Sequence, residues 1–459
     1  MRLSSDQTSA GMLFVAIGVL AAQAPVQSDT WWLLRAGADI WDTWRVPLVD
    51  GYSHTAAGRY WWNHEWLSEL LFYGLFRLGG LPLLTIGCTG AVVATWAIIW
   101  RTCRARFELL LVVTGLCLVV AAQTWAIRPQ VLSALLFAVV MRLAIDDRKA
   151  VWIPAVVVVW ANLHGAAVSS LVLVAGAAAG AAVWQRRVPW RLTAILAASA
   201  LAIGASPVGF RMYTEIAASM ERSRMNALIE WLPPAFTPGL VPFWILAVAL
   251  PVATIALWRK SDERTARLIG IAIACLPLAL RSTRNVGFFL IAAVPAFTTV
   301  LAPLIPAARP PKGERPGLNA AVMAVAVAAG IIIVALVWRN APPRLGWHPI
   351  APDAVRAIES CPGPLYNTYG DGGVLIWWTP QQRVFIDNRQ DPYSTELLRT
   401  NKTMETNGEY GEPFAQYKIQ CAAVPPQSAI AGRLAADPQW SVTYRDPQWL
   451  VAIRQPRPQ

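Results

Sequence analysis

The chain has 459 residues, of which 56% are hydrophobic and only 14% charged, whereas about 25% of the residues in an ordinary soluble domain are charged. This composition excludes a soluble globular enzyme. The net charge of +12 does not indicate a nucleic-acid partner, because the basic residues are scattered through short loops and form no single basic face. The apolar residues form long blocks, several near the roughly 20 residues that a helix needs to cross a lipid bilayer, and they predict a polytopic membrane protein.

Eleven apolar segments are predicted to be transmembrane helices, which form an all-α bundle over residues 1–340. The first segment is poorly flanked for a cleaved signal peptide, and we expect it to stay as an anchor. The predicted segments are 11–26, 82–100, 107–124, 130–145, 151–163, 165–184, 190–205, 242–258, 268–280, 286–305 and 318–338.

A long outer loop is expected at 27–81, between the first two segments. Its apolar stretch 66–78 has only 13 residues and ends at Gly79-Gly80, which favours an interfacial helix over a crossing. The loops on one side then hold sixteen Arg and Lys residues, and the short loops on the other hold three. The positive-inside rule therefore places the N-terminus in the cytoplasm, and the first loop and C-terminal domain outside.

Residues 347–459 are predicted to form an extracytoplasmic α/β domain, because short strand-like runs alternate there with helix-like segments. The strand-like runs are PLYNTY, GVLIWW, RVFID, IQCAAV, WSVTYR and WLVAI, and the helix-like segments are STELLRTNKTME and SAIAGRLAAD. The run Gly370-Asp371-Gly372-Gly373 lacks the spacing and the Lys-Ser/Thr of a nucleotide-binding loop. A turn between two strands is the stronger interpretation of this run.

Polar residues at the ends of the predicted segments are expected to gather on the outer face of the membrane. Ionisable groups beside hydrocarbon are costly unless they are paired or functional, so such a cluster predicts a substrate site. The candidates are Asp29, His64, Glu65, Arg128, Gln130, Asn162, His164, Glu230, Arg281, Arg284 and Asn285.

Each candidate also has a structural interpretation. The three arginines suit a phosphate or diphosphate, which guanidinium groups bind in a forked geometry, and they also suit helix carbonyls or lipid head groups. His164 with Asn162 fits an interhelical hydrogen-bond pair better than a substrate contact. His64-Glu65 lacks a spaced third ligand, so interface anchoring is as good an explanation as a metal pair.

Asp29 is the sharpest candidate, because it follows the first segment and precedes the aromatic pair Trp31-Trp32. A partly desolvated carboxylate at the interface suits a base that deprotonates an acceptor hydroxyl. An aspartate before an apolar run also suits a helix N-cap.

Several segments resemble polytopic membrane glycosyltransferases of the GT-C superfamily, in a largely uncharacterised bacterial branch. They are the run 28–80 in the first loop, then IRPQ, NLHG, IEW, RSTRN, YGDGGVLIWW and VFIDNRQDPY, in order over most of the chain. The resemblance implies a plasma-membrane enzyme of the cell envelope, with its active site outside. Such an enzyme takes a sugar from a polyprenyl-phosphate carrier to a glycan, lipid or protein acceptor, with inversion.

Asp29 matches the position of the base in that branch. A second aspartate and a histidine of the branch are replaced here by Gln27 and Leu33, which argues against a two-carboxylate or metal mechanism, so no cofactor is assigned and a divalent metal is left open. The resemblance further implies that Arg128, Arg281 or Arg284 stabilises the departing phosphate.

The last domain is then expected to bind the acceptor or to brace the loops. Asp387, Arg389 and Asp391 are better explained as a surface turn than as substrate contacts. Because the outer compartment is oxidising, a disulfide is predicted between Cys361 and Cys421, the two cysteines in polar sequence.

Two other classes of protein stay open. A transporter or flippase of lipid-linked or small substrates is expected to carry ionisable residues through the whole membrane depth, whereas here they collect at one face. In a non-catalytic scaffold for envelope glycan assembly, mutation of Asp29 would leave function intact.

Overall fold

The computed structural model describes residues 3–225, 229–305 and 314–455. By its contacts the chain divides into two compact units. The helical unit comprises Met1–Pro25, Pro82–Tyr213 and Ile229–Asn340, and the mixed unit comprises Val26–Leu81, Thr214–Leu228 and Ala341–Gln459.

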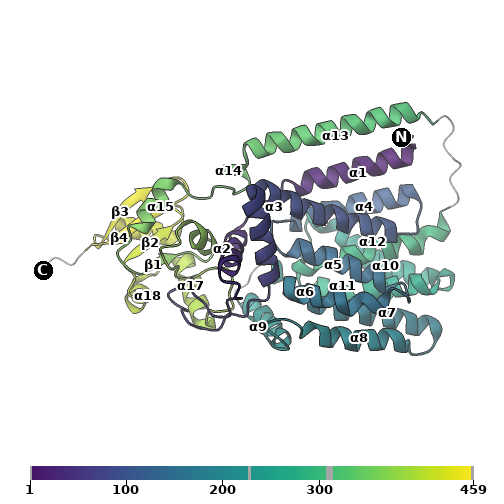
Figure 1. Ribbon diagram of the computed structural model, residues 1–459, viewed down its shortest axis with the longest axis horizontal. Helices are drawn as coiled ribbons and strands as arrows, with labels where there is room; N and C mark the ends of the chain where they lie inside the picture. The colour runs from purple at the N-terminus through teal and green to yellow at the C-terminus, as the bar shows by residue number, and fades with distance from the viewer. Residues whose placement is uncertain (1–2, 226–228, 306–313, 456–459) are drawn as a thin grey trace. The chain divides into compact units, whose positions relative to one another are not determined.

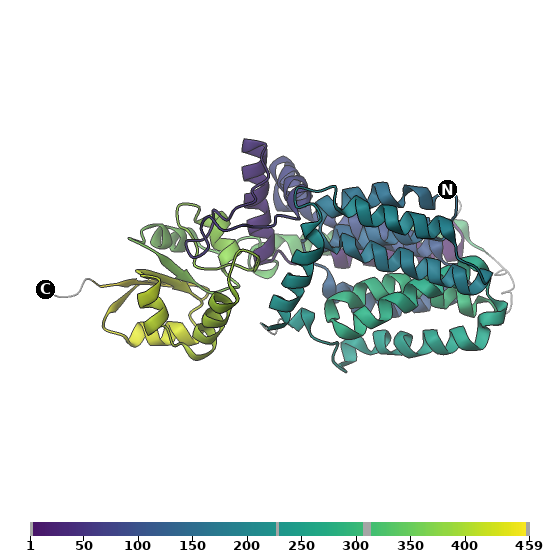
Figure 2. The ribbon, with the colours of Figure 1, turned by 90° about the horizontal axis from the view of Figure 1, so that it is seen from below.

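All eleven predicted apolar segments lie in helices of the helical unit, which run alongside one another (Figures 1 and 2). Besides the second half of α3 (Trp66–Thr102), they are α1 (Ser5–Ala21), α4 (Phe107–Ala121), α5 (Gln130–Ala144), α6 (Ile153–Leu163), α7 (Ser169–Gln185), α8 (Trp190–Ile203), α10 (Val241–Leu257), α11 (Glu263–Arg281), α12 (Val286–Leu301) and α13 (Pro316–Arg339).

The chain is a multi-pass membrane protein. Six helical stretches are long and apolar enough to cross a membrane by length and composition: Trp66–Thr102, Phe107–Thr124, Gly165–Gln185, Pro238–Lys260, Thr283–Leu304 and Pro316–Arg339. Four shorter apolar helices accompany them, so the number of eleven crossings stays a prediction.

The helix α3 (Trp66–Thr102) breaks at the predicted glycine pair. Gly79 and Gly80 have non-helical backbone angles, and Gly80 has a φ of 64°, a left-handed conformation that only glycine adopts without strain. The two units also divide between Leu81 and Pro82. The stretch 66–78 is therefore a helix of its own, distinct from the apolar helix that follows the break.

Contacts inside the helical unit test the sidedness of its loops. At one end of α1 and α13, Ser5 Oγ donates to Glu314 Oε1 at 2.9 Å, and at the other Trp338 Nε1 donates to the Ala22 carbonyl at 2.9 Å. These two helices therefore run parallel and lie side by side (Figure 1). Segments 1–22 and 314–340 then begin at the same end of the bundle, as the predicted topology requires.

The end of the first segment lies beside the connection between α4 and α5, because the Ile127 N–H donates to the Pro25 carbonyl at 3.3 Å. A crossing by the stretch 66–78 would put Ile127 at the opposite end of the bundle. At that opposite end, Arg104 pairs with Asp262 at 3.0 Å. These contacts agree with the stretch 66–78 adding no crossing.

The mixed unit contains a four-stranded sheet in the order β1-β2-β4-β3, in which β1 and β2 are parallel and the other pairs antiparallel. The strands are β1 (Leu365–Asn367), β2 (Cys421–Val424), β3 (Trp440–Arg445) and β4 (Leu450–Arg454). Its helices include α2 (Ser28–Thr43), α15 (Pro352–Glu359), α16 (Gly372–Trp378), α17 (Thr395–Asn407), α18 (Gly411–Gln416) and α19 (Ala429–Ala436). The α/β class is confirmed, and four of the six strand-like runs are strands.

The other two runs were predicted wrongly. GVLIWW forms α16, and RVFID makes only an isolated bridge between Ser53 and Val384. The glycine run therefore begins a helix and is not a turn between two strands. A short apolar run does not distinguish a buried strand from a helix, and here packing decides, because Trp378 lies edge-on to Trp31 of α2 at 5.3 Å.

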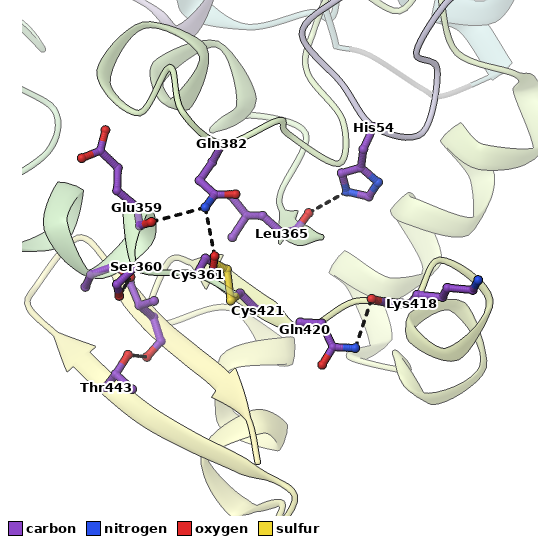
Figure 3. Close-up of a disulfide and its surroundings, with 12 residues drawn as sticks. His54, Glu359, Ser360, Cys361, Leu365, Gln382, Lys418, Gln420, Cys421 and Thr443 are labelled. Carbon is purple, nitrogen blue, oxygen red and sulfur yellow. Dashed lines mark hydrogen bonds between the residues drawn. A yellow bond between two sulfur atoms is a disulfide. The ribbon is translucent and has the colours of Figure 1, made fainter. Parts of the chain in front are cut away.

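The first loop belongs to the mixed unit, whereas the predicted domains placed it with the bundle over 1–340. The Val384 N–H donates to the Tyr52 carbonyl, and the His54 N–H donates to the Val384 carbonyl, both at 3.0 Å. The His54 ring also bonds to the Leu365 carbonyl at 2.9 Å (Figure 3). The polar backbone of this loop thus finds its partners in the C-terminal region.

Cys361 and Cys421 are joined by a disulfide that closes 60 residues of chain, with their Cα atoms 6.0 Å apart (Figure 3). Closing a loop of this length stabilises the folded state by about 4 kcal/mol in the chain-entropy model. We expect the double replacement by serine to lower the melting temperature of the protein, while Cys103→Ser does not. Titration of the denatured, unreduced protein with maleimide is expected to find four thiols, the free cysteines being Cys88, Cys103, Cys117 and Cys275. Six reactive thiols would contradict the pairing.

Candidate functional site

The helical unit brings together five of its polar and aromatic residues in an arginine cluster, which consists of Arg128, Gln130, Glu230, Trp231 and Arg284. Arg128 precedes α5, Glu230 lies in the 3-10 turn Ile229–Trp231, and Arg284 lies in the turn Thr283–Asn285 between α11 and α12. Arg284 Nη1 donates to Glu230 Oε1 at 2.6 Å, and Arg128 Nη1 lies 4.0 Å from Glu230 Oε2.

Backbone bonds hold these turns in place. The Thr283 N–H donates to the Leu232 carbonyl at 2.9 Å, and Ser282 Oγ donates to the Glu230 carbonyl at 3.0 Å. The Arg284 guanidinium also lies over the Trp231 ring, 5.1 Å from its centre, a geometry that favours a cation.

Gln130 completes the cluster as a hydrogen-bond acceptor. In the amide orientation that satisfies its neighbours, its side-chain oxygen accepts from Arg284 Nη2 at 2.9 Å and from Arg128 Nη2 at 3.2 Å. The two guanidinium groups are thereby tied to each other through one neutral oxygen and one carboxylate.

Two guanidinium groups of the cluster face the carboxylate of Glu230. Burial alone would raise the pKa of Glu230, but the neighbouring Arg284 and Arg128 guanidiniums outweigh it and hold the pKa below its ordinary value, so Glu230 is ionised at neutral pH. The arginine side chains are 22% and 23% exposed. Two cations that share one anion and remain open to solvent can accept an external anion such as a phosphate.

Other candidates of the helical unit support helix ends. Asn162 Nδ2 donates to the Val158 and Ala205 carbonyls at 2.8 Å, and Asn285 Nδ2 donates to the Leu278 carbonyl at 3.3 Å. These bonds satisfy backbone acceptors near helix ends.

His164 and Arg281 differ in their surroundings. His164 Nδ1 bonds with Ser133 Oγ at 2.8 Å and accepts from the Ala166 N–H at 3.2 Å. Arg281 is exposed at the end of α11 and forms no ion pair with the described part of the chain. His164 thus bonds to α5 through Ser133, and Asn162 bonds to the end of α8 through the Ala205 carbonyl.

Asp29 is buried in the mixed unit, 7% exposed, in the first turn of α2. The N-cap of this helix is Gln27, so the N-cap interpretation of Asp29 was wrong. A carboxylate in the first turn is stabilised by the helix dipole. Asp29 Oδ1 also accepts a hydrogen bond from Asn388 Nδ2. The local sequence of α2 gives no indication of this contact.

The loop 387–391 is buried, so its interpretation as a surface turn was wrong. Arg389 Nη2 donates to Asp50 Oδ1 and to Asp387 Oδ2, both at 2.6 Å, and all three side chains are at most 1% exposed. The same guanidinium lies over the rings of Tyr52 and Trp61, 4.9 and 4.7 Å from their centres. This buried ion-pair network ties the first loop to the C-terminal domain.

The end of the loop 387–391 contacts α9 (Arg211–Met225). Ser223 Oγ donates to Gln390 Oε1 at 3.2 Å, and Arg222 Nη2 pairs with Asp391 Oδ1 at 3.2 Å. The loop therefore joins the segments 26–81 and 214–225 to the sheet of the mixed unit.

We expect Arg389→Leu to destabilise the mixed unit strongly. Removing one partner of a buried pair leaves uncompensated charge, here on Asp50 and Asp387, at a cost of about 3–5 kcal/mol. The melting temperature of the purified protein measures this effect, with Arg383→Ala as the control, since Arg383 is exposed in the same domain. Equal melting temperatures for the two variants would contradict the structural role of Arg389.

His64 and Glu65 contact each other, with His64 Nε2 3.6 Å from Glu65 Oε1, and the His64 ring stacks on Trp62 at 4.0 Å. Within residues 3–225, 229–305 and 314–455, no three His, Cys, Asp or Glu side chains are placed to hold a metal ion together. The observed contacts are between neighbouring polar side chains, with the His64 ring packed on Trp62.

The helical unit and the mixed unit together give a fold that is shared with solved structures of membrane glycosyltransferases. Two solved structures are similar to the chain. One is the archaeal oligosaccharyltransferase AglB from Archaeoglobus fulgidus, in complex with an inhibitory peptide and a dolichol-phosphate, with a TM-score of 0.53, 12% identity, and coverage of 91% of this chain and 69% of that one. The other is ArnT from Cupriavidus metallidurans bound to undecaprenyl phosphate, with a TM-score of 0.50, 13% identity, and coverage of 97% of both chains.

No family model matches the chain, and no curated protein matches its sequence. At 12–13% identity the two structures establish the fold, and they assign no activity to the residues described above.

Proposed function

We propose that the protein is a GT-C type membrane glycosyltransferase that takes a sugar from a polyprenyl-phosphate carrier. The observation that carries this proposal is the arginine cluster, in which Arg128 and Arg284 share the carboxylate of Glu230 and remain partly exposed. Its chemistry suits a phosphate monoester or diester. The similar structures support the choice of ligand, since one holds dolichol-phosphate and the other undecaprenyl phosphate.

In the proposed reaction, a nucleophilic oxygen or nitrogen of the acceptor attacks the anomeric carbon of the sugar. The bond between that carbon and the phosphate oxygen breaks, and the carrier phosphate leaves with the electron pair. Arg128 and Arg284 stabilise the charge on the leaving phosphate, with Arg281 as a third basic group near the end of α11. Asp29 takes the proton of the acceptor. No nucleotide is needed, because the phosphate is already a leaving group.

We place the reaction on the outer face of the plasma membrane, with the N-terminus in the cytoplasm and the mixed unit outside. The excess of Arg and Lys in the loops of the opposite side supports this orientation. An alkaline phosphatase fusion at the C-terminus, which is active only outside the cytoplasm, is expected to be active in intact cells. An inactive phosphatase fusion with an active cytoplasmic reporter at the same position would reverse the orientation.

The decisive experiment uses the purified full chain in lipid nanodiscs with a panel of radiolabelled polyprenyl-phosphate sugars. We expect release or transfer of the sugar from at least one donor, and binding of undecaprenyl phosphate that weakens as salt is raised. Binding without turnover over the whole panel would favour a transporter or flippase. Neither binding nor turnover would favour a scaffold.

A further inference from the structure

The loop 387–391 presents Asn388 to Asp29, and contacts of neighbouring groups hold the loop. Arg389, the next residue, is fixed in the buried ion-pair network with Asp50 and Asp387. The backbone carbonyl of Asn388 accepts a hydrogen bond from the Tyr369 hydroxyl at 3.2 Å. Asn388 Nδ2 then donates to Asp29 Oδ1, so the position of the donor is set by neighbours on both sides of it.

The other polar atom of the Asn388 side chain has no structural use. Its carbonyl oxygen Oδ1 is buried and has no hydrogen-bond partner among the residues that the structure describes. A buried polar atom without a partner costs free energy, and such atoms call for a specific explanation. Among the described residues, the Asn388 side chain therefore makes one hydrogen bond, to Asp29, and leaves its own carbonyl oxygen unsatisfied.

Asn367 shows what a structural asparagine looks like in the same domain. Its Nδ2 donates to the Thr368 and Ile386 carbonyls at 2.8 and 2.7 Å, and its Oδ1 accepts from the Phe385 N–H at 2.8 Å. Every polar atom of that side chain braces the backbone. Among the residues that the structure describes, the Asn388 side chain bonds to no backbone group, which distinguishes it from Asn367.

We infer that Asn388 is a positioning residue that fixes the Asp29 carboxylate for proton transfer, an inference that rests on the proposed function of Asp29 as the base. A neutral amide suits this task, because it orients the carboxylate without cancelling its charge. A guanidinium or ammonium group at the same place would hold the carboxylate more strongly and weaken it as a base.

The titratable groups close to Asn388 are neutral or paired. Burial and then the Asp29 charge raise the pKa of Tyr369 well above its ordinary value, so Tyr369 stays a neutral hydroxyl. Within the loop 387–391, Asp387 is paired with Arg389 and Asp391 with Arg222.

The test compares Asn388→Leu, Asn388→Asp and the control Asn367→Leu in nanodiscs, with undecaprenyl-phosphate sugars as donors and water as the acceptor. We expect Asn388→Leu to lower kcat about 10–100-fold at unchanged KM, and to lower the melting temperature less than Asn367→Leu, because it removes one hydrogen bond and an unsatisfied carbonyl whereas Asn367→Leu removes three hydrogen bonds. Asn367→Leu is expected to lower the melting temperature. Asn388→Asp places a second carboxylate beside Asp29, so the acid limb of its pH–rate profile should move up by about one unit.

A measurement without substrate separates this inference from the proposed function. The infrared band of protonated Asp29 is identified as the band that Asp29→Asn removes, and its titration midpoint is followed in wild type, Asn388→Leu and Asn388→Asp. A midpoint that moves in both variants supports the contact, and absence of wild-type turnover would then count against the proposed function alone. An unmoved midpoint, or a loss of melting temperature in Asn388→Leu equal to that in Asn367→Leu, would overturn the positioning role.

Discussion

Asp29→Asn is expected to lower kcat for sugar release or transfer on the order of 10³-fold, the usual scale for loss of a general base. The replacement has nearly the same shape, so the side chain still fits in the first turn of α2. KM for the donor should change little, because the phosphate is assigned to the arginine cluster. Initial rates with the radiolabelled donors measure both constants.

Two further variants separate catalysis from folding. Asp42→Asn changes an exposed carboxylate of the same helix and is expected to retain wild-type rates. The double variant Asp29→Asn with Asn388→Asp swaps the two side chains and keeps one carboxylate and one amide at the contact. Its melting temperature should therefore equal that of wild type. Full activity of this exchanged variant, or of Asp29→Asn itself, would remove Asp29 from the mechanism.

Arg284→Ala is expected to weaken binding of undecaprenyl phosphate about 10–100-fold, since a charge-assisted hydrogen bond contributes roughly 1.5–3 kcal/mol. Arg284→Lys should recover only part of this affinity, because an ammonium group cannot form the forked contact of a guanidinium. Binding titrations in nanodiscs at two salt concentrations measure the effect. Arg104→Ala is the matched control, because Arg104 also pairs with one carboxylate, Asp262, at the opposite end of the bundle.

Glu230→Gln gives the sharper test of the same cluster. If the arginines bind an anion, loss of the competing carboxylate should raise the affinity for undecaprenyl phosphate. If Glu230 and Arg284 form only a structural ion pair, the same variant should lower the melting temperature and leave binding unchanged. A lower melting temperature with unchanged affinity would therefore contradict the phosphate site.

Sequence patterns predicted the helical unit well, because hydrocarbon leaves a polytopic chain few choices. Each backbone polar group of a crossing segment must be satisfied within its own helix, so a long apolar run has one solution. The break at Gly79-Gly80 was also readable, since two adjacent glycines rarely continue a helix. In the C-terminal domain the run GVLIWW had two solutions, and packing against α2 selected the helix.

The candidate sites divide in the same way. The sequence alone determined a multi-pass bundle with an α/β appendage, and it singled out Arg128, Arg284 and Asp29 as polar groups placed beside apolar segments. It did not find the partners of these groups. Glu230 is more than 50 residues from Arg284 and about 100 from Arg128, and Asn388 is separated from Asp29 by 359 residues.

Only the tertiary structure decided that Asp387 and Arg389 are buried with Asp50, that the first loop folds with the C-terminal domain, and that Asn388 holds Asp29. The physical reason is that local patterns report how a segment meets water or lipid, whereas the partner of a buried charge is chosen by chain segments that meet only on folding. Hydrophobic periodicity does not indicate which segments will supply that partner. The charge and hydrogen-bond requirements of a buried group demand a partner, and the fold supplies it.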